Sequence, residues 1–187
     1  MSGGSPGVAT PPHDVVAFWQ AAGRDKWFTK DAVLDAAIRE RFLGLYKAAT
    51  DGGLTSWEAT SEGALALLIL LDQFPRNMFR GSARIFAADP LARAVAERAL
   101  AMGYEGAVTP DMRLFFYLPF MHSEALADQE HSVALFRALG DEECLRYAED
   151  HADIVRRFGR FPHRNDVLGR ETTAEEQAFL AAGGFSG

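Results

Sequence analysis

Apolar residues recur at helical spacing along most of the chain, and no segment shows the sustained alternation of a strand. This pattern predicts helices over residues 15–22, 31–49, 89–103, 123–139, 141–158 and 173–182, one from about 57 or 62 to 74, and another from 109 onward. We expect Pro75 to end a helix and Asp89 to cap one, because proline lacks the main-chain donor and aspartate accepts hydrogen bonds at helix starts. The chain is therefore predicted to be an all-α single domain of about eight or nine helices.

The two ends of the chain depart from this pattern. Residues 1–13 are rich in glycine, serine and proline, so we expect a flexible N-terminus there, one helical domain over residues 14–182, and a flexible C-terminus over residues 183–187. The first 12 residues carry neither an apolar run nor basic residues and do not resemble a signal peptide.

Two predicted helices are apolar nearly all round, and they cover Ala64–Leu71 and Met112–Met121. Burying one large apolar side chain contributes roughly 1.5–3 kcal/mol. These two segments are therefore expected to dominate the core.

Three polar clusters come at the ends of predicted helices. They cover residues 72–77 (DQFPRN), 119–124 (PFMHSE) and 157–165 (RFGRFPHRN). If the helices pack with these ends on one side of the core, the clusters converge there.

Composition and charge narrow the classes of function. The 187 residues are 48% hydrophobic and 24% charged, with a net charge of -7, which argues against general binding of nucleic acid. The longest apolar run, Ala64–Leu71, is far shorter than the roughly 20 residues of a membrane span. The single cysteine, Cys144, excludes an internal disulfide and fits a reducing compartment. We expect a cytoplasmic protein without membrane or nucleic-acid partners.

The arginines of the clusters are the candidate anion ligands. Arg76, Arg160 and Arg164 carry guanidinium groups, which donate paired hydrogen bonds to carboxylates and phosphates. Asn77 and Asn165 belong to the same clusters and are counted with them. The alternative is that the arginines cap unpaired carbonyl groups at helix ends.

Acidic and histidine side chains suggest two kinds of chemistry. Asp72 follows an apolar run and is expected to be at least half-buried. We expect it to form an ion pair with an arginine. The alternative is that Asp72 transfers protons together with His122 or His163. His151 lies in an apolar stripe, which favours a core histidine over a metal ligand or proton-transfer group. Glu124 falls on one helical face with two further metal-binding residue types, Asp128 and His131, but no established metal motif is present and no metal is predicted.

The three clusters in this order, together with residues 15–19 (VVAFW) and 27–28 (WF), resemble the bacterial domain-of-unknown-function family nine-two-four. The resemblance covers about residues 14–180. It implies a fold similar to tetratricopeptide-repeat proteins, with antiparallel helix pairs in a superhelical bundle, and it implies no activity, cofactor or catalytic residue. Such folds bind partners more often than they catalyse reactions, by analogy.

Three functions remain open. The first is a binding domain that holds a small anionic ligand or an acidic peptide in a polar cavity, shaped by His122, His151 and His163. The second is a hydrolase-type enzyme that uses Asp72 or Glu124 with His122 or His163, with or without a metal ion. The third is a scaffold whose outer surface binds a partner protein.

Overall fold

The structure is a computed structural model that describes residues 10–185. Over these residues the chain forms helices and turns and no strand, which confirms the predicted all-α class. The α-helices are α1 (Pro12–Ala22), α2 (Arg24–Trp27), α3 (Ala32–Thr50), α4 (Ser61–Leu68), α5 (Phe74–Met78), α6 (Asp89–Ala101), α7 (Pro110–Met121), α8 (Leu126–Leu139), α9 (Glu142–Phe158) and α10 (Ala174–Ala181). A π-helical turn, η2 (Ile69–Gln73), joins α4 to α5, and short 3-10 helices cover η1 (Thr55–Ala59), η3 (Ala83–Phe86), η4 (Tyr104–Ala107) and η5 (Pro162–Arg164).

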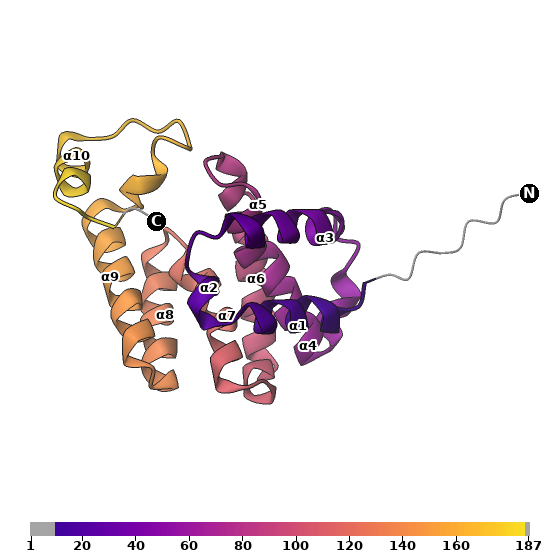
Figure 1. Ribbon diagram of the computed structural model, residues 1–187. Coiled ribbons are helices and arrows are strands. Elements are labelled where there is room, and N and C mark those ends of the chain that lie inside the picture. The colour runs from indigo at the N-terminus through magenta and orange to yellow at the C-terminus, as the bar shows by residue number, and fades with distance from the viewer. Residues whose placement is uncertain (1–9, 186–187) are drawn as a thin grey trace, which may run out of the picture.

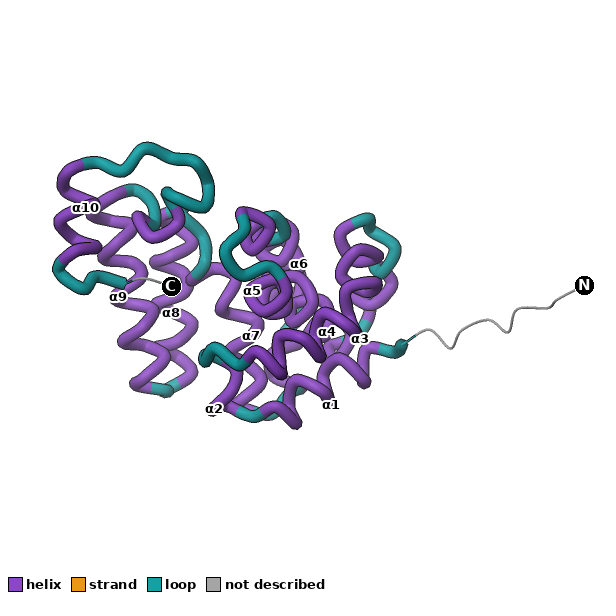
Figure 2. Tube along the Cα trace, turned by 45° about the horizontal axis from the view of Figure 1, so that its top comes forward, coloured by secondary structure: helices purple, strands orange, loops and turns teal. Residues whose placement is uncertain are grey.

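The helices α8 and α9 lie side by side at one end of the molecule, and α1 to α6 form the other end (Figure 1). The helix α7 lies between them and packs against both α6 and α8. The loops around α10 extend beyond the end of α9, and the turned view in Figure 2 keeps this arrangement. The superhelical stacking implied by the family resemblance stays a prediction.

The core forms where the two apolar segments meet. Leu68 in α4 and Phe116 in α7 have no exposed surface. Aromatic rings of α1 and α2 pack on rings of α5 and α7: the ring centroids of Trp19 and Phe74 lie 5.5 Å apart, and those of Trp27 and Phe115 lie 4.9 Å apart. The prediction that these segments are buried is therefore confirmed.

The prediction that Pro75 ends a helix is wrong. The chain continues from α4 through η2 into α5, and Pro75 sits in the first turn of α5. Pro75 has no main-chain N–H to donate, and it follows directly on the π-helical turn, in which the main-chain nitrogen of Phe74 donates to the oxygen of Ile69 five residues back. The π-helical turn that permits this arrangement contains Asp72. Such turns are rare and are frequent at functional sites.

Other predicted boundaries also shift. The helix expected from residue 123 begins only at Leu126, and α1 begins at Pro12, inside the predicted flexible N-terminus. Asp89 is not a cap: Ala88 is the N-cap residue of α6, and the carboxylate of Asp89 contacts Arg76 instead. The remaining predicted flexible residues 1–9 and 186–187 lie outside the described part of the chain.

A smaller apolar cluster holds the C-terminal segment on α9. It consists of buried Ile154, Val155 and Phe161 with the partly buried rings of Phe158, Phe179 and Phe185. The ring of Phe185 lies 4.5 Å from that of His151, so the described end of the chain packs against the domain. The flexibility expected for residues 183–187 stays a prediction. This cluster fixes the position of the third polar cluster.

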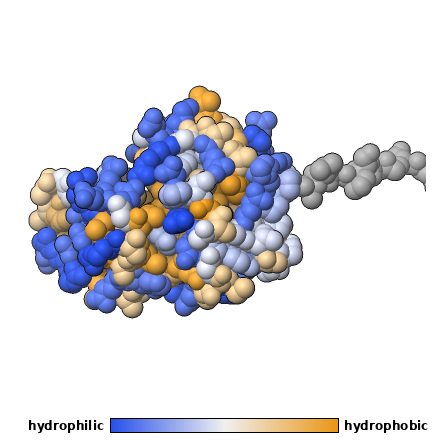
Figure 3. All heavy atoms as spheres, turned by 90° about the horizontal axis from the view of Figure 1, so that it is seen from below, coloured by the Kyte–Doolittle hydropathy of each residue, from blue (hydrophilic) through white to orange (hydrophobic). Residues whose placement is uncertain are grey.

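Large apolar side chains that face solvent are scattered. The most exposed are Val33, Met102 and Phe28, which come from three separate segments. The face shown in Figure 3 likewise mixes hydrophobic and hydrophilic residues. Among residues 10–185 no helix is both long and apolar enough to span a membrane. The cytoplasmic location stays a prediction.

Candidate functional site

Two of the predicted residues meet in a buried pair. Nδ1 of His122, at the end of α7, lies 2.7 Å from Oδ1 of Asp72 in the π-helical turn. The Asp72 side chain is only 1% exposed, whereas the His122 side chain is 15% exposed. The other ring nitrogen, Nε2, hydrogen-bonds to none of the described residues. The pair therefore joins a buried carboxylate to a ring that reaches the surface.

Two arginines lie beside this pair and share one further carboxylate, Asp89. Arg76 donates to Oδ1 and Oδ2 of Asp89 at 3.2 and 3.3 Å and also to the main-chain oxygen of Asp72. Arg164 lies 3.8 Å from Asp89 and donates to the main-chain oxygen of His122 at 2.9 Å. Its guanidinium lies between the rings of Phe86 and Phe161, 4.3 and 4.5 Å from their centroids.

The surroundings keep Asp72 ionised and the ring of His122 neutral. Burial raises the pKa of Asp72, but Arg76 and His122 outweigh burial and lower this pKa to about 2. Burial and Arg76 lower the pKa of His122, against the opposite effect of Asp72. Burial also lowers the pKa of Arg164 to about 10, although Asp89 opposes it.

Neighbouring amides fix both members of the pair. Gln73 donates from Nε2 to Oδ2 of Asp72 at 2.6 Å. Gln129, fully buried in α8, donates from Nε2 to the main-chain oxygens of Met121 and Ser123 at 2.7 and 2.6 Å. These two oxygens flank His122, so Gln129 holds the turn that carries the ring.

A second polar network ties the third cluster to the rest of the molecule. Arg170 donates two hydrogen bonds to Glu124 at 2.7 and 2.9 Å, and the main-chain nitrogen of Phe161 donates to Glu124 at 2.8 Å. Arg160 donates to both oxygens of buried Glu176 at 2.6 and 2.8 Å. Each of these two arginines therefore donates two hydrogen bonds to a single carboxylate.

Four predicted residues form no hydrogen bond with Asp72 or His122. Asn165 donates to Glu176 at 3.2 Å, within the second network. Asn77 donates to Asp35 of α3 at 2.8 Å. His151 is a core histidine, with Nδ1 2.7 Å from the main-chain oxygen of Tyr147. His163 packs on Phe185, and burial lowers its pKa to about 3.

Glu124, Asp128 and His131 do not share one helical face. Because α8 begins at Leu126, Glu124 precedes the helix and faces Arg170, while Asp128 accepts a hydrogen bond from Ser123 at 2.6 Å. In the described range 10–185 no three histidine, cysteine, aspartate or glutamate side chains are grouped to hold a metal ion.

The sequence pattern does not reveal the partners of these residues. Asp89, Arg170 and Glu176 complete the ion pairs, and Gln73 and Gln129 complete the amide contacts. The pattern places Asp89 at a helix start, and its position directly before a proline does not show which way its side chain turns. Arg170 stands in polar surroundings, where nothing distinguishes it from a surface charge. Glu176 stands three residues after Thr173, a spacing that predicts the capping box of α10 but not the contact with Arg160.

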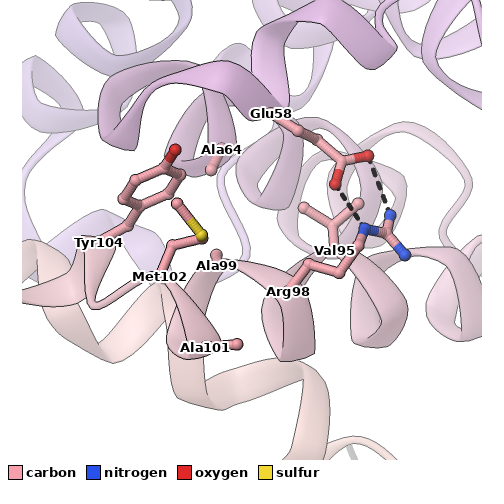
Figure 4. A pocket seen from close by; sticks show the side chains of 8 residues that line it. All are labelled: Glu58, Ala64, Val95, Arg98, Ala99, Ala101, Met102 and Tyr104. Carbon is pink, nitrogen blue, oxygen red and sulfur yellow. Dashed lines mark hydrogen bonds and ion pairs between the residues drawn. The ribbon is translucent and has the colours of Figure 1, made fainter.

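Two hollows in the surface lie elsewhere. One, of about 370 Å³, is lined by apolar side chains such as Val95 and Met102 beside the ion pair of Glu58 and Arg98 (Figure 4). The other, of about 220 Å³, lies beside Arg24 and Asp141. Neither hollow includes a residue of the three polar clusters.

The chain is similar to a protein family and to a solved structure, and neither has a known function. A family model described as bacterial protein of unknown function (DUF924) matches residues 15–184. The solved structure of a protein of unknown function, ATU0120 from Agrobacterium tumefaciens, is 50% identical and superposes with a TM-score of 0.89. The match covers 91% of this chain and 97% of that one. No curated protein matches the chain.

Proposed function

Because the chain belongs to DUF924, a family of bacterial proteins of unknown function, we propose a function from its own residues: it binds a small anionic ligand beside His122, Arg76 and Arg164. We call the group of Asp72, Arg76, Asp89, His122 and Arg164 the His122 site.

The contrast between loose and tight ion pairs carries this proposal. Charge-assisted hydrogen bonds between arginine and carboxylate are typically about 2.7–2.9 Å long. The pairs of Arg160 and Arg170 reach that range, whereas Arg76 and Arg164 share Asp89 at 3.2 to 3.8 Å. Nε of Arg164 is buried and bonds to no described residue. The ion pairs with Asp89 are therefore longer than the pairs of the second network, although Arg76 also lies 3.6 Å from Oδ1 of Asp72.

Burial limits the size of the ligand. His122 and Arg76 have side chains that are 15% and 23% exposed, while those of Arg164 and Asp89 are 8% and 13% exposed. A ligand would approach the ring and one guanidinium from solvent and meet the deeper groups behind them. This geometry favours a small anion over an acidic peptide.

Titration with inorganic phosphate and acetate at constant ionic strength tests the proposal by calorimetry. We expect Arg76→Gln to weaken binding about tenfold or more, because it removes a charge-assisted donor. Arg137→Gln is the matched control, since Arg137 forms an exposed pair with Glu149 in which the side chains are 62% and 50% exposed. His122→Gln provides the same comparison if Arg76→Gln does not fold. Binding that is absent in the wild type, or equally weakened by the control, refutes the proposal.

An acid–base enzyme is the second candidate, and the contact between Asp72 and His122 favours it. A histidine oriented by a carboxylate at one ring nitrogen can accept a proton at the other. Of the four residues considered for this chemistry, only these two contact each other, because Glu124 is bound by Arg170 and His163 packs among aromatic rings. Hydrolysis of chromogenic phosphate or carboxylate esters that is abolished by His122→Ala would support this candidate.

A further inference from the structure

The contact with Asp72 determines which nitrogen of His122 carries hydrogen. The ionised carboxylate of Asp72 only accepts hydrogen bonds, so Nδ1, at 2.7 Å from Oδ1, must be the donor. In a neutral imidazole the other nitrogen then holds a lone pair and accepts. Nε2 of His122 is therefore a hydrogen-bond acceptor toward any ligand at the His122 site.

This tautomer is held from both sides. Gln73 donates to Oδ2 of Asp72 at 2.6 Å, which leaves Oδ1 directed at the ring. The π-helical turn places Asp72 where only 1% of its side chain is exposed, so water does not compete for the carboxylate. Burial and Arg76 lower the pKa of His122, which keeps the ring neutral near neutral pH.

A ligand at the His122 site thus meets guanidinium donors and one acceptor. The oxygens of a fully deprotonated oxyanion match Arg76 and Arg164 but present a lone pair to the lone pair of Nε2. An oxyanion that keeps a hydroxyl hydrogen can donate it to Nε2 and accept from the arginines. A polar group left unpaired in a buried site carries a substantial free-energy cost.

We propose that the His122 site selects oxyanions that carry a hydroxyl hydrogen beside their charge, of which hydrogen phosphate is the simplest, over oxyanions without one, such as sulfate. This selectivity rests on the proposed anion binding and adds the chemical class of the ligand to it.

Five neighbouring groups influence the pH at which the ring of His122 gains a proton. The groups that act on it are Asp72 from η2, Arg76 from α5, Asp89 from α6, Arg164 from η5 and His151 from α9. Carboxylates and guanidiniums ordinarily keep their charge between about pH 5 and 8. His151 stays neutral there, because burial lowers its pKa to about 4. As pH falls, His122 gains a proton at Nε2 and becomes a donor, which sulfate can use.

Competition between phosphate and sulfate tests the selectivity on the full chain. Calorimetric titrations at equal ionic strength should give phosphate an affinity on the order of tenfold higher at about pH 8. The ratio should fall once pH is low enough to protonate the ring, whose pKa burial and Arg76 hold below its ordinary value. Equal affinities at about pH 8 overturn the selectivity and leave the proposed anion binding intact. If neither anion binds, the proposed function fails and the selectivity fails with it.

Asp72→Asn offers a sharper test, because it should reverse the tautomer. The oxygen of the new amide is needed by Gln73, so its nitrogen donates to Nδ1 of His122 and hydrogen moves to Nε2. Sulfate should then bind at least as tightly as phosphate at about pH 8. If the variant does not fold, nitrogen chemical shifts of His122 in the wild type report the tautomer directly. A hydrogen on Nε2 of the neutral wild-type ring would overturn the inference.

Discussion

The hydrogen bonds of Glu124 are expected to stabilise the fold, and the change Glu124→Gln tests this. Oε1 of Glu124 accepts from the main-chain nitrogen of Phe161 at 2.8 Å and from Nη2 of Arg170 at 2.9 Å, and Oε2 accepts from Nη1 of Arg170 at 2.7 Å. These contacts join the turn after α7 to the segment after α9. The matched control is Glu149→Gln, because Glu149 makes a single exposed contact with Arg137 at 3.0 Å.

The expected loss follows from the bonds that an amide can keep. The oxygen of the glutamine can replace Oε1 and hold both of its contacts, but the amide nitrogen then faces the donor Nη1 of Arg170. One charge-assisted bond, ordinarily about 1.5–3 kcal/mol, is lost. The side chains of Glu124 and Arg170 are 28% and 23% exposed, so water can hydrogen-bond to Nη1 of Arg170 in the variant and reduce the loss of free energy. We expect Glu124→Gln to lower the free energy of unfolding by about 1–2 kcal/mol and Glu149→Gln by less than about 0.5 kcal/mol.

Urea unfolding, followed by circular dichroism and tryptophan fluorescence, measures both losses. Arg170 and the Phe161 contact lower the pKa of Glu124 below its ordinary 4.5 despite burial, which raises it. A carboxyl whose pKa is lower in the folded state stabilises the fold above its unfolded pKa, and this stability is lost as pH falls through the folded pKa. The difference between wild type and Glu124→Gln should therefore shrink from about pH 5 toward pH 2.

Two results would refute this reasoning. Equal losses for Glu124→Gln and Glu149→Gln would show that the paired contact contributes no more than an exposed one. A difference that stays constant as the carboxyl becomes protonated would show that charge is not its source. A double-mutant cycle with Arg170→Gln isolates the pairwise free energy.

Three further predictions concern packing, acid stability and thiol reactivity. Gly63→Ala should destabilise the fold by about 1–3 kcal/mol, because the new Cβ would lie 2.0 Å from the main-chain oxygen of Trp57. Gly44→Ala is the control: a Cβ there meets nothing within 4 Å, so this change should stabilise the helix by about 0.5–1 kcal/mol. Thermal unfolding of the two variants measures the difference. Burial lowers the pKa of His163 from 6.5 to about 3, so between these pH values the histidine takes up a proton when the chain unfolds. The free energy of unfolding should therefore fall as pH decreases through this range. His163→Phe should make this dependence on pH weaker, as measured by urea unfolding at several pH values. Burial raises the pKa of Cys144 to about 11, so its alkylation by iodoacetamide at about pH 8 should be slower than that of glutathione.

Local patterns of residues were sufficient to predict most of the helices and the two buried segments. The spacing of apolar residues located the core segments of α4 and α7, and Thr109 with Pro110 marked the start of α7, where Thr109 is the N-cap residue. These features depend on interactions within one or two turns, so neighbouring residues define them. The polar clusters were likewise visible, because charged residues directly after an apolar run are unusual, although the first of them lies within a continuing helix and not at its end.

Partner choice depended on contacts between residues that are far apart along the chain. His122 and Asp72 are separated by 50 positions, and Glu124 and Arg170 by 46. No local spacing reports such pairs, and the strength of each depends on burial that only packing creates. The π-helical turn is a further example, since η2 and α5 pack against α3, a separate helix earlier in the chain. Folding therefore decided which arginines were saturated by carboxylates and which were left with weaker contacts, because that outcome depends on distances in space.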